Sequence, residues 1–366
     1  MIGIVCFWDR YATPYLSKYE KLLDDMDMAY EVLLWNRTPK ENEKMTSQSA
    51  NEININIACS GAKIQKLVAF LKWRCAMQKV IKEKQYDHLI ILSTAPAVLL
   101  FKTLLCKYKG NYLFDIRDYT LEKNKFFQHI VMKLIDDSVL TSISSKGYMR
   151  WLKPSSKIMV NHNITVSRET KPSIPQLNGK KSLNFAFVGN VRLDSQTEAL
   201  LLALRDETRI EQHYYGRIIP GCRIREIKDQ YKIDNLHFHG AFTVLDKPRI
   251  FEDVDLINCV YANAEKEEDI PIGDSTPLPN RLYDSITFYR PIVASKGTYL
   301  AELVEQYHLG CCVNGFETSA KKDMIEYVDT FDANEFVDGC NTLKAIVIRE
   351  EEEYLRTLKK IFIDWK

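Results

Sequence analysis

The chain has 366 residues, a length that fits two domains of ordinary size. With 46% hydrophobic and 27% charged residues, its composition is that of a globular protein. Its 50 basic and 49 acidic residues nearly cancel, so overall charge gives no support to nucleic acid as a partner. Nine cysteines without a CxxC spacing argue against a zinc module or a disulfide framework.

Membrane insertion and secretion are not expected from the apolar segments. No apolar run approaches the roughly 20 residues that a membrane span needs. The opening residues Met1–Phe7 are apolar but short, and no basic stretch precedes them as in a secretory signal. We therefore expect a cytoplasmic protein.

Short apolar runs rich in branched residues alternate with longer amphipathic stretches, a pattern that predicts parallel sheets with crossover helices. In the first half the expected strands are 2–7, 30–35, 87–93, 111–115, 138–142 and 157–160. After a polar break, strands are expected at 183–188, 212–215, 236–238, 254–260, 291–295 and 310–313. The chain is thus predicted to be α/β, with two doubly wound Rossmann-like domains facing across a cleft.

The domain boundaries follow from the same pattern. We expect an N-terminal domain over 1–165, a linker over 166–181, a C-terminal domain over 182–342 and a closing helix over 343–366. Ligands of doubly wound sheets bind at the carboxyl ends of the strands, so an active site is expected between the domains.

Three expected strands of the second half end in glycine followed or preceded by polar residues. The first runs into Gly189, Asn190 and Arg192, the second into Arg217, and the third ends at His239 and Gly240. Glycine lets a backbone approach a ligand closely, and arginine can reach phosphate oxygens with a planar fork. An ordinary strand-to-helix turn with a solvated arginine explains the first motif equally well.

Two motifs carry residue types that can bind metals, but neither predicts a metal site. His237 and His239 alternate along a strand and share a face, but no third ligand lies nearby in sequence. Asp253 and Asp255 have the spacing of a DxD motif, yet they open an apolar strand. We expect neither a metal nor a cofactor.

The segment Pro279–Asp284, followed by Arg290–Ser295, predicts a short helix that opens at a proline, then a tight turn and a buried strand. A helix N-terminus offers unpaired N–H groups and a partial positive charge to a diphosphate. A carboxylate one turn into such a helix can accept hydrogen bonds from a ribose.

These motifs, in this order, resemble the C-terminal domain of GT-B glycosyltransferases, and most of all the family that builds bacterial capsular and lipopolysaccharide sugars. The resemblance implies that Asp284 binds the ribose and that Asn280 with Arg281 lies at the diphosphate end, with Leu282 among the nucleotide-binding residues. It also implies that Gly189 and Arg192 form the phosphate-facing turn, and that His239 and Gly240 approach the base. The chain departs from the family at Thr276, where many relatives carry the first of two glutamates eight residues apart.

Acids and aromatic residues past the strands of the first half are candidates for acceptor chemistry. Asp118 is the first candidate for the general base and Asp115 the second, with an Asp115–Arg117 ion pair as the alternative. Arg192 is a further catalytic candidate, for the departing diphosphate. Predicted acceptor contacts are Trp8, Asp9, Arg10 and Arg117.

Residues 63–84 predict a helix with two different apolar faces. We expect Ile64, Leu67, Val68, Leu71 and Cys75 to pack on the sheet. A second face carries Lys63, Lys66, Phe70, Trp73 and Arg74, and is predicted to dock on the inner leaflet of the cell membrane. The alternative is that a neighbouring helix covers its two aromatic side chains.

The predicted function is glycosyl transfer from a nucleotide-sugar to a lipid-linked or oligosaccharide acceptor of the bacterial surface, without a metal. A nucleotide-sugar epimerase of similar fold is one alternative. A non-catalytic protein that binds a sugar or nucleotide is another.

Overall fold

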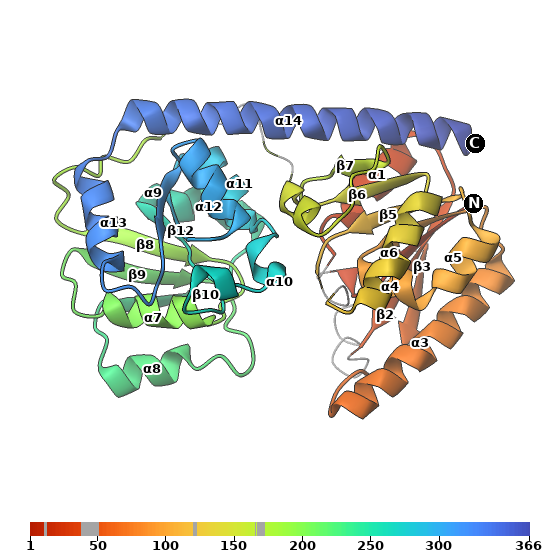
Figure 1. Cartoon of the computed structure of the whole chain (residues 1–366), viewed down its shortest axis with the longest axis horizontal. Helices are drawn as coiled ribbons and strands as arrows, with labels where there is room; N and C mark the ends of the chain where they lie inside the picture. The colour runs from red at the N-terminus through yellow and green to blue at the C-terminus, as the bar shows by residue number, and fades with distance from the viewer. Residues whose placement is uncertain (11–12, 38–50, 120–122, 165, 167–172) are drawn as a thin grey trace. The chain divides into compact units, whose positions relative to one another are not determined.

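The computed structural model describes residues 1–10, 13–37, 51–119, 123–164, 166 and 173–366, and it divides the chain into two compact units (Figure 1). The first unit comprises Met1–Asn163 together with Glu350–Lys366, and the second comprises Ile164–Arg349. Residues 167–172 of the predicted linker lie outside the described part.

The first unit is built on a seven-stranded sheet in the order β3-β2-β1-β4-β5-β6-β7, in which every pairing is parallel. Its strands are β1 (Ile2–Cys6), β2 (Tyr30–Asn36), β3 (Glu52–Asn56), β4 (His88–Leu92), β5 (Tyr112–Ile116), β6 (Leu140–Ile143) and β7 (Ile158–Val160). Its helices are α1 (Leu16–Asp25), α3 (Lys63–Lys84), α4 (Thr94–Leu99), α5 (Phe101–Lys107) and α6 (Lys125–Asp137), with the short 3-10 helix η2 (Lys146–Arg150).

The central strands of this sheet are apolar along their whole length because helices cover both faces. In β1 all five residues are buried. Val5 points into a cluster with Trp73 of α3, whereas Ile4 points into a cluster with Leu16 and Tyr19 of α1.

The second unit has a six-stranded parallel sheet in the order β10-β9-β8-β11-β12-β13. Its strands are β8 (Leu183–Val188), β9 (Ile210–Tyr215), β10 (Leu236–Gly240), β11 (Leu256–Cys259), β12 (Ile292–Ser295) and β13 (Gly310–Val313). Its helices are α7 (Ser195–Ala203), α8 (Ile224–Tyr231), α9 (Lys247–Asp253), α10 (Ile272–Ser275), α11 (Asn280–Phe288), α12 (Tyr299–Gln306) and α13 (Ala320–Asp329), with 3-10 turns η3 (Val244–Asp246) and η4 (Glu267–Asp269).

Both sheets have the doubly wound strand order, so the predicted pair of Rossmann-like domains is confirmed. The order reverses between β1 and β4 in the first unit and between β8 and β11 in the second. Loops that follow these four strands are where ligands of such sheets bind. All twelve predicted strands are present, and β3 is the one strand of the described residues that the sequence pattern missed.

The final helix, α14 (Ala333–Asp364), begins ten residues before the predicted closing helix and contributes to both cores. Phe336, Leu343 and Val347 pack in the second unit. Tyr354 and Phe362 pack in the first. Within the described ranges, no helix combines the length and apolarity needed to cross a bilayer.

Helix α3 packs with the face opposite to the one predicted. Trp73 is fully buried and stacks on Trp35 at 5.6 Å between ring centroids, and Phe70 is half-buried with its ring 5.5 Å from that of Phe7. The prediction of Trp73 and Phe70 as membrane-facing is therefore wrong, because these large rings fill the aromatic cluster at the ends of β1 and β2. The stripe expected to pack on the sheet is exposed instead: Ile64 76%, Leu67 58%, Val68 43% and Leu71 49%.

Candidate functional site

Three neighbouring strands of the second unit end in a row of glycines, which we call the glycine rim: Gly189 after β8, Gly216 after β9 and Gly240 at the end of β10. The amide of Gly189 donates to the Tyr215 carbonyl (2.9 Å), and that of Gly216 donates to the Gly240 carbonyl (2.7 Å). Gly216 has φ +137°, and a Cβ placed on it would lie 1.7 Å from the carbonyl oxygen of Gly189. Only glycine fits there, so the rim presents bare backbone at the carboxyl edge of the sheet.

Two arginines follow the rim on adjacent chain segments. Val191 and Ile218 form a parallel bridge, so the segments after β8 and β9 continue side by side. The side chain of Arg192 is 55% exposed, and its Nε donates to Asp194 at 3.0 Å. Arg217 is exposed as well. Both cations therefore stand at the carboxyl edge of the sheet beside the glycine rim, as the sequence predicted from their position after strand ends.

A polar network joins the loops after β8 and β11, the two strands that flank the reversal of strand order. Asn263 donates from Nδ2 to Asp194 (3.2 Å) and to Asp274 (3.0 Å), and its Oδ1 accepts the amide of Ser195 (3.1 Å). Sequence reasoning missed Asn263 and Asp274. The sequence did offer one indication of this network, because Asn263 lies four residues past the end of the buried strand β11.

The loop after β12 borders a pocket of about 310 Å³. Its lining residues are Glu267, Lys296, Gly297, Thr298, Ala301, Glu302 and Glu305. Thr298 caps α12 by accepting the amide of Ala301 (3.1 Å), and Lys296 pairs with Glu317 (2.8 Å). The pocket therefore lies at the N-terminus of α12, the end of a helix that favours negative charge.

Asp284, expected to bind a ribose, is not open to a ligand. It is 5% exposed, and its Oδ1 accepts a hydrogen bond from Lys247 of α9 at 2.6 Å. Burial raises the pKa of this carboxyl, and Lys247 and Arg281 oppose that shift. The ribose assignment is corrected accordingly, because an ion pair already satisfies the carboxylate inside the unit.

The neighbours of Asp284 on α11 are also turned inward. Arg281 is 8% exposed, donates to the Asn258 carbonyl at 2.5 Å, and lies 3.9 Å from the centroid of the Phe187 ring. Leu282 is a core residue with 1% exposure. The predicted contact of Arg281 with a diphosphate and the predicted role of Leu282 in nucleotide binding are therefore wrong in this structure. Asn280, at the start of the helix, is exposed and stays a prediction.

His239 belongs to a stack of rings on β9 and β10. Its ring lies parallel to that of Tyr215 at 4.0 Å, and its Nε2 shares a hydrogen bond with His213 Nδ1 at 2.9 Å. His237 instead pairs with Glu211 at 2.6 Å. Burial, together with the two other histidines, lowers the pKa of His213 to about 4. In the described part of the chain, no three His, Cys, Asp or Glu side chains are grouped to hold a metal ion.

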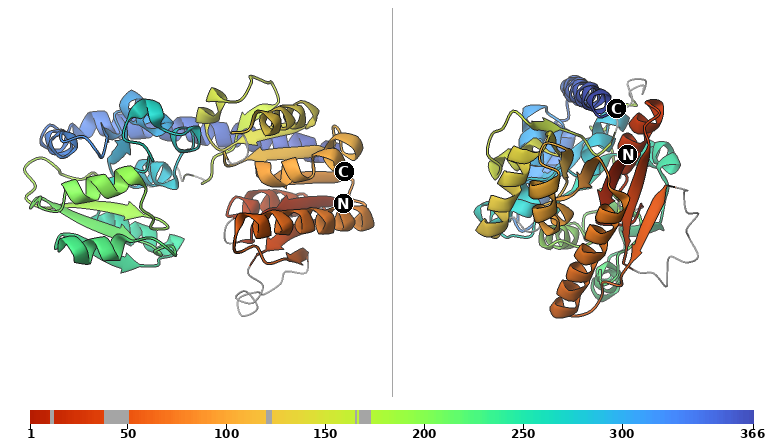
Figure 2. Two further views of the ribbon diagram at one scale, coloured as in Figure 1. Left: turned by 60° about the horizontal axis from the view of Figure 1, so that its bottom comes forward. Right: turned by 90° about the vertical axis from the view of Figure 1, so that its right-hand side faces the viewer.

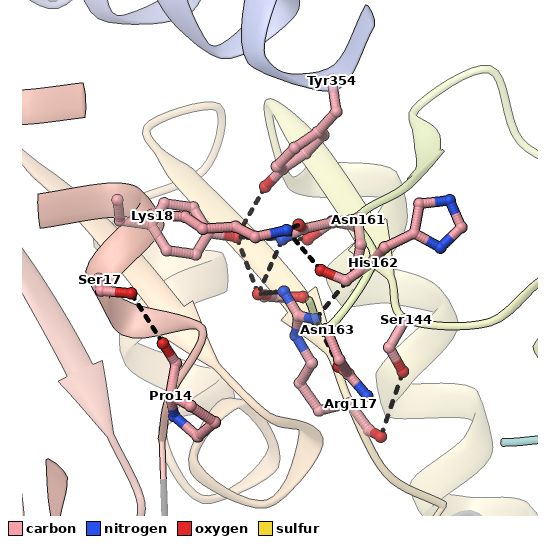
Figure 3. A network of polar contacts seen from close by, with 12 residues as sticks. Pro14, Ser17, Lys18, Arg117, Ser144, Asn161, His162, Asn163 and Tyr354 are labelled. Atoms are coloured by element: carbon pink, nitrogen blue, oxygen red, sulfur yellow. Dashed lines mark hydrogen bonds and ion pairs between the residues drawn. The ribbon is translucent and has the colours of Figure 1, made fainter. Parts of the chain in front are cut away.

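Two of the predicted residues in the first unit serve a buried polar network (Figure 3). Arg117 Nη2 donates to Asp115 at 2.7 Å, and Nη1 donates to the Asn161 carbonyl at 2.9 Å. Asp115 also accepts from Tyr19 (2.8 Å), whose hydroxyl meets that of Tyr354 at 2.7 Å. Asp115 is fully buried and Arg117 is 6% exposed, so the predictions of a base at Asp115 and an acceptor contact at Arg117 are wrong.

Asp118 remains the candidate base. It is exposed, and its pKa is raised because the surrounding protein partly desolvates it and because Asp115 lies near, with Arg117 opposing. Its carbonyl accepts from Thr94 at 3.4 Å. Next to Thr94, Ser93 has φ +87°, a strained conformation at the end of β4 where the strand order reverses. The sequence pattern did not indicate that strain.

The loop after β1 contains the remaining acceptor candidates. Trp8 is 40% exposed, with the guanidinium of Arg37 3.5 Å from the centroid of its ring. Arg10 is held by Glu20 (2.8 Å) and Glu52 (2.5 Å), so its charge is already paired. The exposed ring of Trp8 is therefore a better acceptor candidate than Arg10, and Asp9 stays a prediction.

No protein-family model and no curated protein sequence matches the chain. Solved structures do match over nearly the whole length. Sucrose-phosphate synthase from Thermosynechococcus elongatus superposes with a TM-score of 0.73 at 11% identity, covering 100% of this chain and 98% of that one. HepE from Anabaena, solved with UDP and glucose, has a TM-score of 0.63 at 13% identity, covering 98% and 99%.

A third match is WaaG, a glycosyltransferase involved in lipopolysaccharide biosynthesis, with a TM-score of 0.60 at 8% identity, covering 97% of this chain and 98% of WaaG. At these identities the likeness concerns the fold. The chain has the two-domain Rossmann-like fold of GT-B glycosyltransferases.

Proposed function

We propose that the protein is a glycosyltransferase whose second unit binds a nucleotide-sugar at the glycine rim. The observation that carries this proposal is the row of three strand ends, bare of side chains, from which Arg192 and Arg217 extend. A diphosphate needs close backbone approach and cations, and this edge offers both. The match to HepE, which was solved with UDP and with UDP-glucose, supports a uridine nucleotide as the first ligand to try.

Transfer requires stabilisation of the departing diphosphate. Arginines and backbone amides fixed before the reaction can supply it electrostatically, so the proposed mechanism has no metal step. Arg192 and Arg217 are assigned this role. Asp118 is the proposed base for the acceptor hydroxyl, because a carboxyl with a raised pKa holds a proton more readily near neutral pH.

The proposed acceptor is a lipid-linked glycan of the bacterial surface, met by a cytoplasmic protein at the inner face of the membrane. Structural matches to WaaG and to WaaB, a lipopolysaccharide outer core galactosyltransferase, support this class of acceptor. The exposed ring of Trp8 provides a face on which a sugar can stack.

A thermal-shift screen against UDP, GDP and ADP, with and without attached sugars, tests the proposal at its first step. A ligand that binds only the folded protein raises the melting temperature in proportion to ligand excess and affinity. Release of nucleoside diphosphate from the binding nucleotide-sugar then tests chemistry. Binding without release or transfer would leave a binding protein, and a changed sugar on the intact nucleotide would indicate an epimerase.

A further inference from the structure

The N-terminal half of α3 exposes an apolar stripe that no described residue covers. Ile64, Leu67, Val68 and Leu71 stand at i, i+3, i+4 and i+7, so they share one side of the helix, and their exposed fractions are 76%, 58%, 43% and 49%. Figure 2, in its right-hand view, shows this end of α3 extending past the strands of the first sheet. Isolated exposed apolar side chains are ordinary, but four on one stripe mark an interaction surface.

The stripe cannot be turned inward by rotating the helix. The other side of α3 buries Ala69, Trp73, Met77 and Ile81, each with 4% exposure or less. Trp73 packs edge-on to Phe7 at 5.1 Å and lies in the main apolar cluster of this face of the sheet. The orientation of α3 is therefore set by its large buried side chains, and the smaller aliphatic stripe stays on the surface.

The same helix concentrates positive charge in a chain that is nearly neutral overall. Its cations are Lys63, Lys66, Lys72, Arg74, Lys79, Lys82 and Lys84, and its one acid is Glu83. Lys63 and Lys72, which flank the stripe, are exposed. The net charge of the 366 residues is +1. A surface that is both apolar and cationic complements one that is both apolar and anionic.

We propose that this stripe docks on a lipid bilayer that contains anionic headgroups. Leucine and isoleucine side chains would enter the boundary between headgroups and acyl chains while the flanking lysines contact the headgroups, as in interfacial amphipathic helices. A cation near an anionic membrane contributes about 1 kcal/mol, or about a fivefold gain in partitioning. The inference does not rest on the proposed transferase activity, since no residue of the stripe belongs to the glycine rim and binding is measured without donor.

Vesicle flotation of the full chain tests it, with phosphatidylcholine vesicles and with vesicles that also contain phosphatidylglycerol. The variant Lys63→Glu/Leu67→Ser removes one flanking cation and one leucine of the stripe. The matched control Ile363→Ser/Lys359→Glu makes the same two kinds of change at exposed positions of α14, where Ile363 is 61% exposed. All four positions are on the surface, so both variants should keep the wild-type melting temperature.

We expect the wild type and the control to float with the anionic vesicles, and the Lys63→Glu/Leu67→Ser variant to bind at least about tenfold more weakly. Equal flotation of that variant and the wild type, or no flotation of the wild type, would overturn the proposal. A third contradicting result would be a wild type that does not bind vesicles but dimerises with rising concentration, with the variant unable to dimerise. The stripe would then contact a second copy of the chain. Each of these results leaves nucleotide binding to be judged separately.

Discussion

Replacing Lys247 by methionine tests whether Asp284 is a structural carboxylate. The two charged groups are 2.6 Å apart, and their side chains are 16% and 7% exposed. Lys247→Met keeps the side-chain length and leaves Asp284 buried without a partner. Breaking a buried pair from one side costs about 3 to 5 kcal/mol, and we expect about 3 because Lys247 retains some solvent contact.

The cost should depend on pH with a defined sign. Burial places the folded pKa of Asp284 above its unfolded value, so the folded state binds more protons between the two values and stability falls as pH rises across that interval. Removal of Lys247 raises the folded pKa further. The cost of Lys247→Met should therefore be small in acid, where the carboxyl is protonated in both proteins, and should grow with pH.

Urea unfolding followed by circular dichroism measures this cost. All five tryptophans of the chain lie in the first unit, so their fluorescence gives an internal reference there. Asp284→Asn should be less costly than Lys247→Met, because a lone lysine near the surface can reach water. A cost of Lys247→Met that does not grow with pH would refute the reasoning. A loss of UDP affinity in Asp284→Asn at unchanged stability would restore the ribose role.

Three further predictions concern Gly216, Trp73 and His213, and the first two have a control substitution. In Gly216→Ala the new Cβ would clash with the carbonyl oxygen of Gly189 at a backbone with positive φ. This variant should therefore lose about 2 to 4 kcal/mol of stability in thermal melts and bind nucleotide more weakly. The control Gly221→Ala has a positive φ (+84°) but open space around the Cβ, and should lose only about 1 kcal/mol. Trp73→Ala should lower the free energy of unfolding, measured by denaturation, by about 3 to 5 kcal/mol, and the control Trp8→Ala should lower it much less. Equal losses in the two variants would contradict the packing of α3. The folded pKa of His213, about 4, lies below the unfolded value of about 6.5, so stability is lost as pH falls between them. Because solvent partly screens this ring, we expect a loss of only about 1 kcal/mol at about pH 5. His213→Gln should remove that loss, and an unaltered pH profile of stability would contradict it.

Strand order and most strand positions could be predicted because buried parallel strands are continuous apolar runs. The exception, β3, reads Glu-Ile-Asn-Ile-Asn and lies at the sheet edge, paired with β2 alone. Alternating isoleucine and asparagine is typical of a strand with one covered face, so β3 lacks the continuous apolar run that marks a buried parallel strand. The edge of a sheet is thus harder to predict than its centre.

The orientation of α3 could not be predicted, because both of its sides are apolar. The stripe of Ile64, Leu67, Val68 and Leu71 has helical spacing, and so does the series Ala69, Trp73, Met77 and Ile81. Helical periodicity therefore does not distinguish which of the two faces packs on the sheet. The choice depends on an aromatic cluster with residues of β2, which lie far away in the sequence.

The places of glycines at strand ends were predicted better than the partners of buried carboxylates. The glycines of the rim follow from strand ends, which local sequence indicates. The burial of Asp284 depends on Lys247, 37 residues earlier, and that of Asp115 depends on Tyr19 and Tyr354. No local sequence pattern shows which distant side chain forms a hydrogen bond or an ion pair with a given carboxylate.

Calorimetric titration of UDP, or of the nucleoside diphosphate that the thermal screen selects, tests the central claim most directly. Arg192→Ala should lower the affinity about tenfold or more, the effect of losing a charge-assisted hydrogen bond to phosphate. The matched control is Arg205→Ala, whose arginine pairs through Nε with Asp206 at 3.1 Å and is 41% exposed, much as Arg192 pairs with Asp194, and which lies away from the rim. Loss of affinity in Arg192→Ala alone is the predicted result, and equal affinities in both variants and the wild type would contradict a diphosphate site at the glycine rim.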